Sequence, residues 1–230
     1  MVTSTVPPAP QRLSPSDRSL HLLSATSGAA DIVAFLKLNM TFTSAMTGNL
    51  ALFGIAVGQG HLLSATHSLT ALMGFITGVA IAALWKGHAF GLRRILGLEI
   101  VFLALYALCW LRWGFPPGGV PLYALILFSA IGMGMQSVAA RLINVAGVPS
   151  VVFTSTLTSI VLVCIQSLHK HQPLPFALRQ QTTALLAYLG GAVFFAFLLM
   201  VMPALAMALP AVLVTLALWI LWHPAADTAA

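Results

Sequence analysis

Eight apolar segments divide this chain, and polar residues interrupt them at only a few places. None of the segments alternates between apolar and polar residues as a membrane-spanning β-strand does. Most are close to the length of about 20 apolar residues that an α-helix needs to cross a bilayer. The pattern therefore predicts an all-α membrane protein. The segments lie at about residues 22–40, 42–58, 69–85, 95–113, 121–142, 148–168, 182–202 and 204–222.

Composition and charge support a membrane location. Of the 230 residues, 60% are hydrophobic and only 6% are charged. Soluble domains carry about 25% charged residues, so this chain has too few to cover a water-facing surface. The net charge of +6 comes from basic residues that flank apolar segments, which favours a topological role over a nucleic-acid partner. We expect a disordered tail at 1–20, one membrane domain at 21–222 and a C-terminal tail at 223–230.

The chain resembles a duplication, with halves at 21–115 and 121–222. Phe42-Thr43-Ser44 in the first half matches Phe153-Thr154-Ser155 in the second. Three further matches follow the same order, and internal repeats of this kind are common in transporters. They pair Ser24-Ala25 and Asp31 with Ser129-Ala130 and Gln136, Gly74-x-x-x-Gly78 with Ala187-x-x-x-Gly191, and Trp110-x-x-Trp113 with Trp219-x-x-Trp222.

The ten basic residues distinguish two topologies. If all eight segments span, five basic residues lie on each side. If the second and sixth segments enter and leave on the same side, only Lys37 and Arg112 lie outside, as the positive-inside rule favours. We therefore expect two inverted halves, each with three transmembrane helices and one re-entrant segment, and both termini in the cytoplasm. Eight short spans in two parallel halves are the alternative. The residues expected inside are Arg12, Arg18, Lys86, Arg93, Arg94, Arg141, Lys170 and Arg179.

Hydroxyl, amide and glycine residues cluster at the start of the second segment, and the sixth carries a similar cluster. Such groups are costly at membrane depth unless they face protein or a wet cavity. A helix that starts there would also offer free N–H donors to an anion. The alternative is packing of helix against helix, which uses the same residue types. The candidate substrate-binding residues are Thr43, Ser44, Thr47, Gly48, Asn49, Thr154, Ser155, Thr158 and Ser159.

Asp31 is the acidic residue of the first apolar segment. An isolated acid within a membrane segment predicts a proton or cation site, and a structural pairing with Lys37 or a nearby hydroxyl is the alternative. Its counterpart Gln136 is neutral, and the two form the candidate ion-coupling pair. Glu99 of the fourth segment follows two arginines within two helical turns, which favours an interfacial ion pair.

The run Asp31-Ile32-Val33-Ala34-Phe35, followed by Phe42 to Leu50, resembles the YoaK-like family. The resemblance covers about residues 20–222, and Met46-Thr47-Gly48-Asn49 is its most specific part. The chain departs from the family pattern at Ala45, where Asn is usual, and at Ser159, where Gly is usual. The resemblance implies a multi-pass protein of the bacterial inner membrane. The function of this family is uncharacterised, and its members are often described as small-molecule transporters.

These features favour a transporter that moves a small polar or anionic solute by alternating access, with a proton on Asp31 as the coupling ion. A non-transporting membrane protein that binds a partner or senses a signal is the alternative. No enzyme is expected, because the chain has no HExxH, Gly-x-Ser-x-Gly or P-loop motif. No cofactor or metal is expected. The expected partners are a small-molecule solute and the lipid bilayer, and a homo-oligomer is left open.

Overall fold

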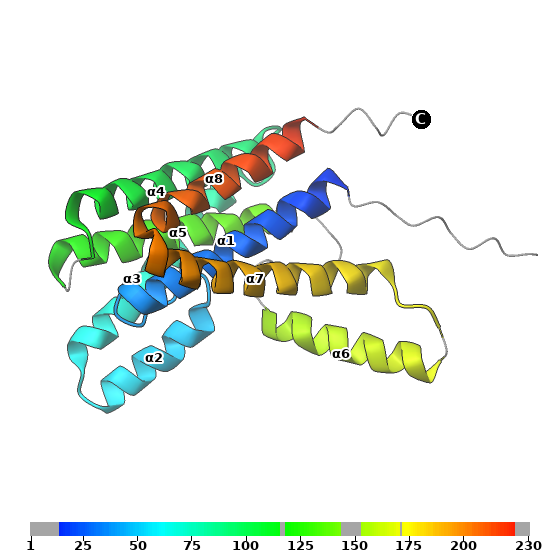
Figure 1. Cartoon of the computed structure of the whole chain (residues 1–230), viewed down its shortest axis with the longest axis horizontal. Helices are drawn as coiled ribbons and strands as arrows, with labels where there is room; N and C mark the ends of the chain where they lie inside the picture. Colours follow the sequence, from blue (N-terminus) through cyan, green and yellow to red (C-terminus); the bar gives the residue numbers. More distant parts are fainter. Residues whose placement is uncertain (1–13, 116–117, 144–152, 171, 224–230) are drawn as a thin grey trace, which may run out of the picture.

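A computed structural model describes residues 14–115, 118–143, 153–170 and 172–223. Within these residues the chain forms eight α-helices and no strand, which confirms the all-α prediction (Figure 1). The helices are α1 (Pro15–Lys37), α2 (Met46–Gly58), α3 (Leu62–Trp85), α4 (Gly91–Trp113), α5 (Gly119–Ile143), α6 (Phe153–His169), α7 (Phe176–Val201) and α8 (Pro203–Trp222).

Six of these helices are long and apolar enough to cross a membrane, namely α1, α3, α4, α5, α7 and α8. The other two are shorter, with 13 residues in α2 and 17 in α6. A straight span of a hydrocarbon layer about 30 Å thick needs about 20 residues at 1.5 Å per residue. Figure 1 shows that α2 and α6 both begin near the middle of the molecule and run outward to opposite ends.

The last helices of the two halves, α4 and α8, run in opposite directions (Figure 1). Near the start of α4, the Arg93 guanidinium lies 5.1 Å from the centre of the Trp222 ring at the end of α8. Further along α4, the Tyr106 hydroxyl donates a hydrogen bond of 3.2 Å to the Met207 sulfur near the start of α8. The two contacts fix the antiparallel register of this pair.

Two helix pairs, α1 with α7 and α3 with α5, have the most extensive packing. At each crossing a glycine of either helix lies against the backbone of the other, where a methyl group would collide with a carbonyl oxygen. The contacts are Gly28 with Tyr188, Gly191 with Ala25, Gly134 with Phe75, and Gly78 with Ile131. A shift of 106 residues converts the α1 positions into those on α5, and a shift of 113 converts the α3 positions into those on α7. The two crossings therefore use equivalent positions of the two halves.

One end of the molecule gathers the starts of α1, α4 and α7 and the ends of α3, α5 and α8. The contacts that join these ends are Asp17 with Gln180, Arg93 with Trp222, Arg94 with Trp85, and the cluster of Leu20, Ala140 and Ala184. Seven of the eight basic residues expected inside lie at these helix ends or in the connection from α6 to α7, and Arg12 lies outside the described residues. Lys37 lies at the opposite end, 5.0 Å from the centre of the Phe115 ring.

The N-terminal boundary differs from the prediction of a tail at 1–20. Helix α1 starts at Pro15, where Ser14 and Asp17 form a capping box, and Asp17 is buried. Its carboxylate also accepts a hydrogen bond from the Gln180 side chain. A tail prediction based on polarity missed this region, because the polar residues here cap a helix and pack against α7. The remaining parts of both predicted tails, 1–13 and 224–230, lie outside the described residues.

The expected ion pair of Glu99 is wrong. Glu99 is fully buried, and neither carboxyl oxygen has a hydrogen-bond partner among the described residues. The two arginines face aromatic rings instead, Arg93 over Trp222 and Arg94 at 4.7 Å from the centre of the Trp85 ring. Guanidinium groups stack favourably on tryptophan, so proximity in sequence did not decide the partner.

Candidate functional site

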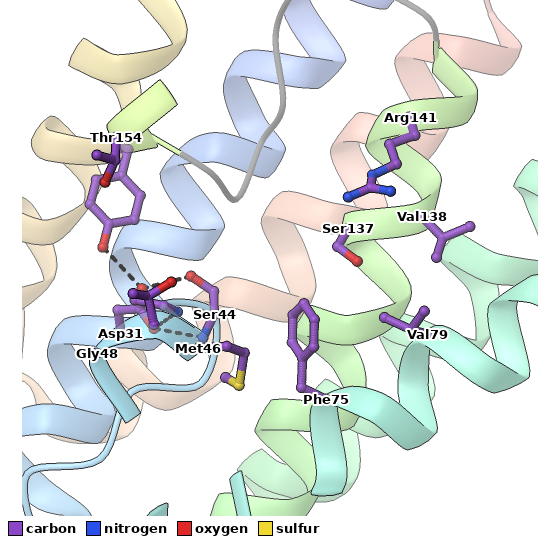
Figure 2. Close-up of a pocket in the computed structure, with 13 residues that line it drawn as sticks. Asp31, Ser44, Met46, Gly48, Phe75, Val79, Ser137, Val138, Arg141 and Thr154 are labelled. Atoms are coloured by element: carbon purple, nitrogen blue, oxygen red, sulfur yellow. Dashed lines mark hydrogen bonds between the residues drawn. The ribbon is translucent and has the colours of Figure 1, made fainter. Parts of the chain in front are cut away.

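A cavity of about 610 Å³ lies beside both glycine crossings, since it is lined by Tyr188 and Phe75, whose backbones Gly28 and Gly134 approach. Figure 2 shows the residues that line it. This volume is within the range of small-molecule sites, about 300–1,000 Å³. Six helices contribute to it, together with the segment that leads into α2. Its lining residues are Asp31, Ser44, Ala45, Met46, Thr47, Gly48, Phe75, Val79, Ser137, Val138, Arg141, Thr154 and Tyr188.

The carboxylate of Asp31 anchors one wall of the cavity (Figure 2). Its Oδ1 accepts hydrogen bonds from the backbone N–H groups of Thr43 (2.9 Å), Ser44 (2.7 Å) and Ala45 (3.3 Å). Its Oδ2 accepts from the Ser44 hydroxyl (2.6 Å) and the Tyr188 hydroxyl (2.9 Å). A carboxylate offers about four lone-pair sites, so these five donors occupy it fully. Asp31 thus holds the segment before α2 against α1 and α7.

The shape of this segment follows from local residues. Asn39 and Met40 have φ angles of 54° and 58°, and this left-handed turn reverses the chain after α1. The Asn49 side chain then brackets the backbone of Phe42, accepting from its N–H at 2.9 Å and donating to its carbonyl oxygen at 2.6 Å. A Cβ at Gly48 would meet the Phe42 ring at 2.8 Å, so glycine permits this close approach.

The sequence predicts free N–H donors for an external anion at the start of α2, and the structure differs from this expectation. The three N–H groups that precede the helix are bonded to the chain's own Asp31 carboxylate. Helix starts favour a negative charge, and Asp31 supplies it here. The polar motif therefore has a structural role at this point as well as a position on the cavity wall.

The opposite wall is formed by α3 and α5 (Figure 2). The shifts that relate the two glycine crossings place Ser137 at the position of Asp31, and Phe75 at the position of Tyr188. One wall therefore carries an acid and a phenol, while the equivalent places on the other wall carry a hydroxyl and a phenyl ring. Matching by residue type had paired Asp31 with Gln136, one residue away from this register.

Five of the predicted site residues line the cavity: Asp31, Ser44, Thr47, Gly48 and Thr154. The others do not. Thr43 contributes only its backbone N–H, Asn49 is buried against Phe42, and Gln136 donates to the Leu23 carbonyl oxygen (2.8 Å) and the Ser27 hydroxyl (2.6 Å) of α1. The remaining three, Ser155, Thr158 and Ser159, lie on α6 outside the lining.

Eight lining residues are not among the candidates from the sequence, namely Ala45, Met46, Phe75, Val79, Ser137, Val138, Arg141 and Tyr188. Tyr188 is one of only three tyrosines in the chain, and it lies near the middle of the seventh segment, where a hydroxyl needs a partner. A tyrosine hydroxyl within an apolar segment therefore could have indicated Tyr188 as a candidate site residue. Phe75 and Ser137 had no such signal, because only the crossing register brings them opposite the acid.

Helices of spanning length with large apolar side chains on their outer faces define a multi-pass membrane protein. The sequence matches the family described as "Protein of unknown function (DUF1275)" over residues 19–220, and the chain belongs to this family. It is also similar to the UPF0700 transmembrane protein YoaK of Bacillus subtilis (strain 168), with 39% identity over 147 residues. That match covers 61% of this chain and 64% of the relative. No solved structure matches.

Proposed function

We propose that the protein transports a small polar or anionic solute across the bacterial inner membrane by alternating access. The cavity carries this proposal, because both halves of the chain line it and both polar motifs reach it, through Ser44 and Thr47 in one half and Thr154 in the other. It lies near the middle of α3 and α7, where transporters bind their substrates. A purely structural role would leave the hydroxyls bonded to neighbouring helices without a cavity.

An inverted arrangement of the halves is part of the proposal. The antiparallel α4 and α8 support it, since the fourth helices of two parallel halves would run in the same direction. The short α2 and α6, which start near the middle and run to opposite ends, suit re-entrant segments (Figure 1). The matching glycine crossings suit a pseudo-two-fold axis through the cavity.

The orientation we infer has both termini in the cytoplasm. The end of the molecule that gathers the starts of α1, α4 and α7 carries the greater number of basic residues. Lys37 and Arg112 are at the other end, and the positive-inside rule then favours the basic end as cytoplasmic.

A coupling proton would bind Asp31 at Oδ2. The three donors to Oδ1 are backbone N–H groups, which cannot become acceptors. Both donors to Oδ2 are hydroxyls, from Ser44 and Tyr188, and either can turn to accept a hydrogen bond from the protonated acid. Protonation would reorganise the link from α1 to α7 while the N–H contacts remain, which couples a proton to the relative position of the helices.

The proposal is tested by filling the cavity. Purified protein is screened by thermal shift against a set of small metabolites, and uptake of each stabilising compound is then measured in proteoliposomes. Thr154→Trp places a large ring in the cavity at an exposed position of α6, so folding should tolerate it. Thr158→Trp, one turn further along and outside the lining, is the matched control. We expect uptake by the wild type and the control, and at least tenfold less by Thr154→Trp.

Binding without uptake would overturn the transport proposal. If compounds stabilise the wild type but none crosses the membrane in any direction, a sensory or partner-binding protein is the better description. If Thr154→Trp transports as fast as the control, the cavity is not the route.

A further inference from the structure

The cavity contains two charged side chains, and only one has its hydrogen-bonding sites occupied. The Asp31 carboxylate is saturated by five donors. Arg141, in the last turn of α5, is exposed and lines the same cavity, and its guanidinium has no hydrogen-bond or ion-pair partner among the described residues. Figure 2 shows the guanidinium directed from the α5 wall into the space between the walls.

Two further donors are available beside this cation. The hydroxyls of Thr47 on α2 and Thr154 on α6 line the cavity and make no hydrogen bond to another described residue. Ser137, by contrast, already donates to the Gly134 carbonyl oxygen at 2.8 Å. The donors that remain for a ligand thus come from α2, α5 and α6.

Apart from the Ser44 and Tyr188 hydroxyls, which donate to Asp31, the rest of the lining carries no polar side chain. Phe75 and Val79 of α3 and Val138 of α5 belong to one apolar cluster and line the wall that carries Arg141 (Figure 2). A cation would find no unoccupied carboxylate oxygen here. A neutral polar solute would leave the guanidinium unpaired, whereas a carboxylate can accept two parallel hydrogen bonds from it.

We propose that the solute is a small organic carboxylate with an apolar body, held by Arg141 through its carboxylate and by Phe75, Val79 and Val138 through its body. The inference rests on the proposed function, since it names the substrate class of the same cavity. Asp31 is not a ligand for the solute. Donors from the chain itself already occupy its acceptor sites, so it offers no site to a cationic group of a solute.

The test uses three probes with the same ring and different charge: benzoate, benzamide and benzylamine. Binding of each to the purified full-length protein in uncharged detergent is measured by isothermal titration calorimetry. We expect benzoate to bind at least tenfold tighter than the other two. Arg141→Gln should weaken benzoate binding by about 10- to 100-fold, since hydrogen bonds between charged groups are strong. Arg141→Lys should retain part of the affinity, because it keeps the charge without the fork of donors.

Arg179→Gln is the control, since Arg179 is exposed at the start of α7 and outside the lining. Equal binding of benzamide or benzylamine, or unchanged benzoate binding by Arg141→Gln, would overturn the inference while leaving transport of another solute open. The inference also fails if phosphatidylglycerol, and not benzoate, stabilises the wild type and loses this effect in Arg141→Gln, because the cation then holds a lipid headgroup. Benzoate binding without uptake would sustain the inference and count against transport.

Discussion

The Tyr188 hydroxyl donates a hydrogen bond of 2.9 Å to Oδ2 of Asp31, and this contact joins the two halves of the chain across 157 positions of sequence. It lies beside the crossing where Gly28 of α1 meets the backbone of Tyr188 itself. The acid is thus linked to α7 at the point where the two helices approach most closely. We therefore expect a change at Asp31 to alter the packing of α1 on α7.

Asp31→Asn should destabilise the fold. The asparagine amide is neutral, so the five donors lose their charged acceptor, and the hydroxyls of Ser44 and Tyr188 must turn to accept from the NH₂ group. We expect a loss of about 2–4 kcal/mol, because hydrogen bonds to a charged acceptor contribute about 1.5–3 kcal/mol each and are not additive. Thermal unfolding of the purified variant in detergent measures this. Ser137→Ala, at the equivalent position of α5, should cost less than about 1.5 kcal/mol. An unchanged unfolding temperature for Asp31→Asn would show that the network does not hold the fold.

Tyr188→Phe separates the coupling role of Asp31 from its structural role. The variant removes one of the two hydroxyl donors at Oδ2 and leaves the N–H contacts at Oδ1. We expect a modest stability loss of about 0.5–3 kcal/mol and a weaker response of solute uptake to an imposed pH gradient in proteoliposomes. Tyr123→Phe is the control. The Tyr123 hydroxyl lies 2.6 Å from the Thr66 hydroxyl, and neither residue lines the cavity. The same change of pH response in both variants would argue against a proton at Oδ2.

The membrane topology can be tested by labelling two positions that we expect on opposite sides of the membrane. In a background with Cys109 and Cys164 replaced by alanine, Phe90→Cys lies between α3 and α4, and His61→Cys lies between α2 and α3. With α2 re-entrant, an impermeant maleimide added to intact cells should label position 61 and leave position 90 unlabelled. With eight spans the result is reversed, because each additional crossing inverts the loops that follow. Labelling of position 90 would therefore contradict the proposed inverted arrangement of the two halves.

Hydropathy was enough to predict the eight helices of the described residues, because each carries a long apolar run, although the polar start of α1 at Pro15 was missed. The site was only partly predictable. Asp31 could be selected as an isolated acid, but its partners are brought to it by a left-handed turn at Asn39 and Met40 and by a helix crossing far along the chain. Neither feature has a periodic signal in the sequence. The sequence indicates only a topological role for Arg141, since no pattern in it predicts that this side chain lines a cavity.

Glu99 is the buried carboxyl for which the fold provides no visible reason, and its replacement should stabilise the protein. The side chain is fully buried on α4, close to Gly132 of α5, and both of its oxygens lack a hydrogen-bond partner among the described residues. An unsatisfied buried polar group costs about 1–3 kcal/mol, more if it is charged. Glu99→Leu or Glu99→Met removes this cost and fills a similar volume within the apolar cluster of Leu96 and Leu103.

We expect these two variants to unfold at a higher temperature in detergent, by about 2–4 °C for each kcal/mol gained. Glu99→Gln, which keeps two polar atoms at the same place, should show little of this gain, and it serves as the control. Uptake measured on the same samples then separates two explanations. A stabilised variant that still transports shows that the acid is dispensable. A stabilised variant that no longer transports indicates that the buried carboxyl is retained for function at a cost in stability. A lower unfolding temperature for both apolar variants would contradict the prediction, since it would mean that Glu99 is satisfied in the folded protein.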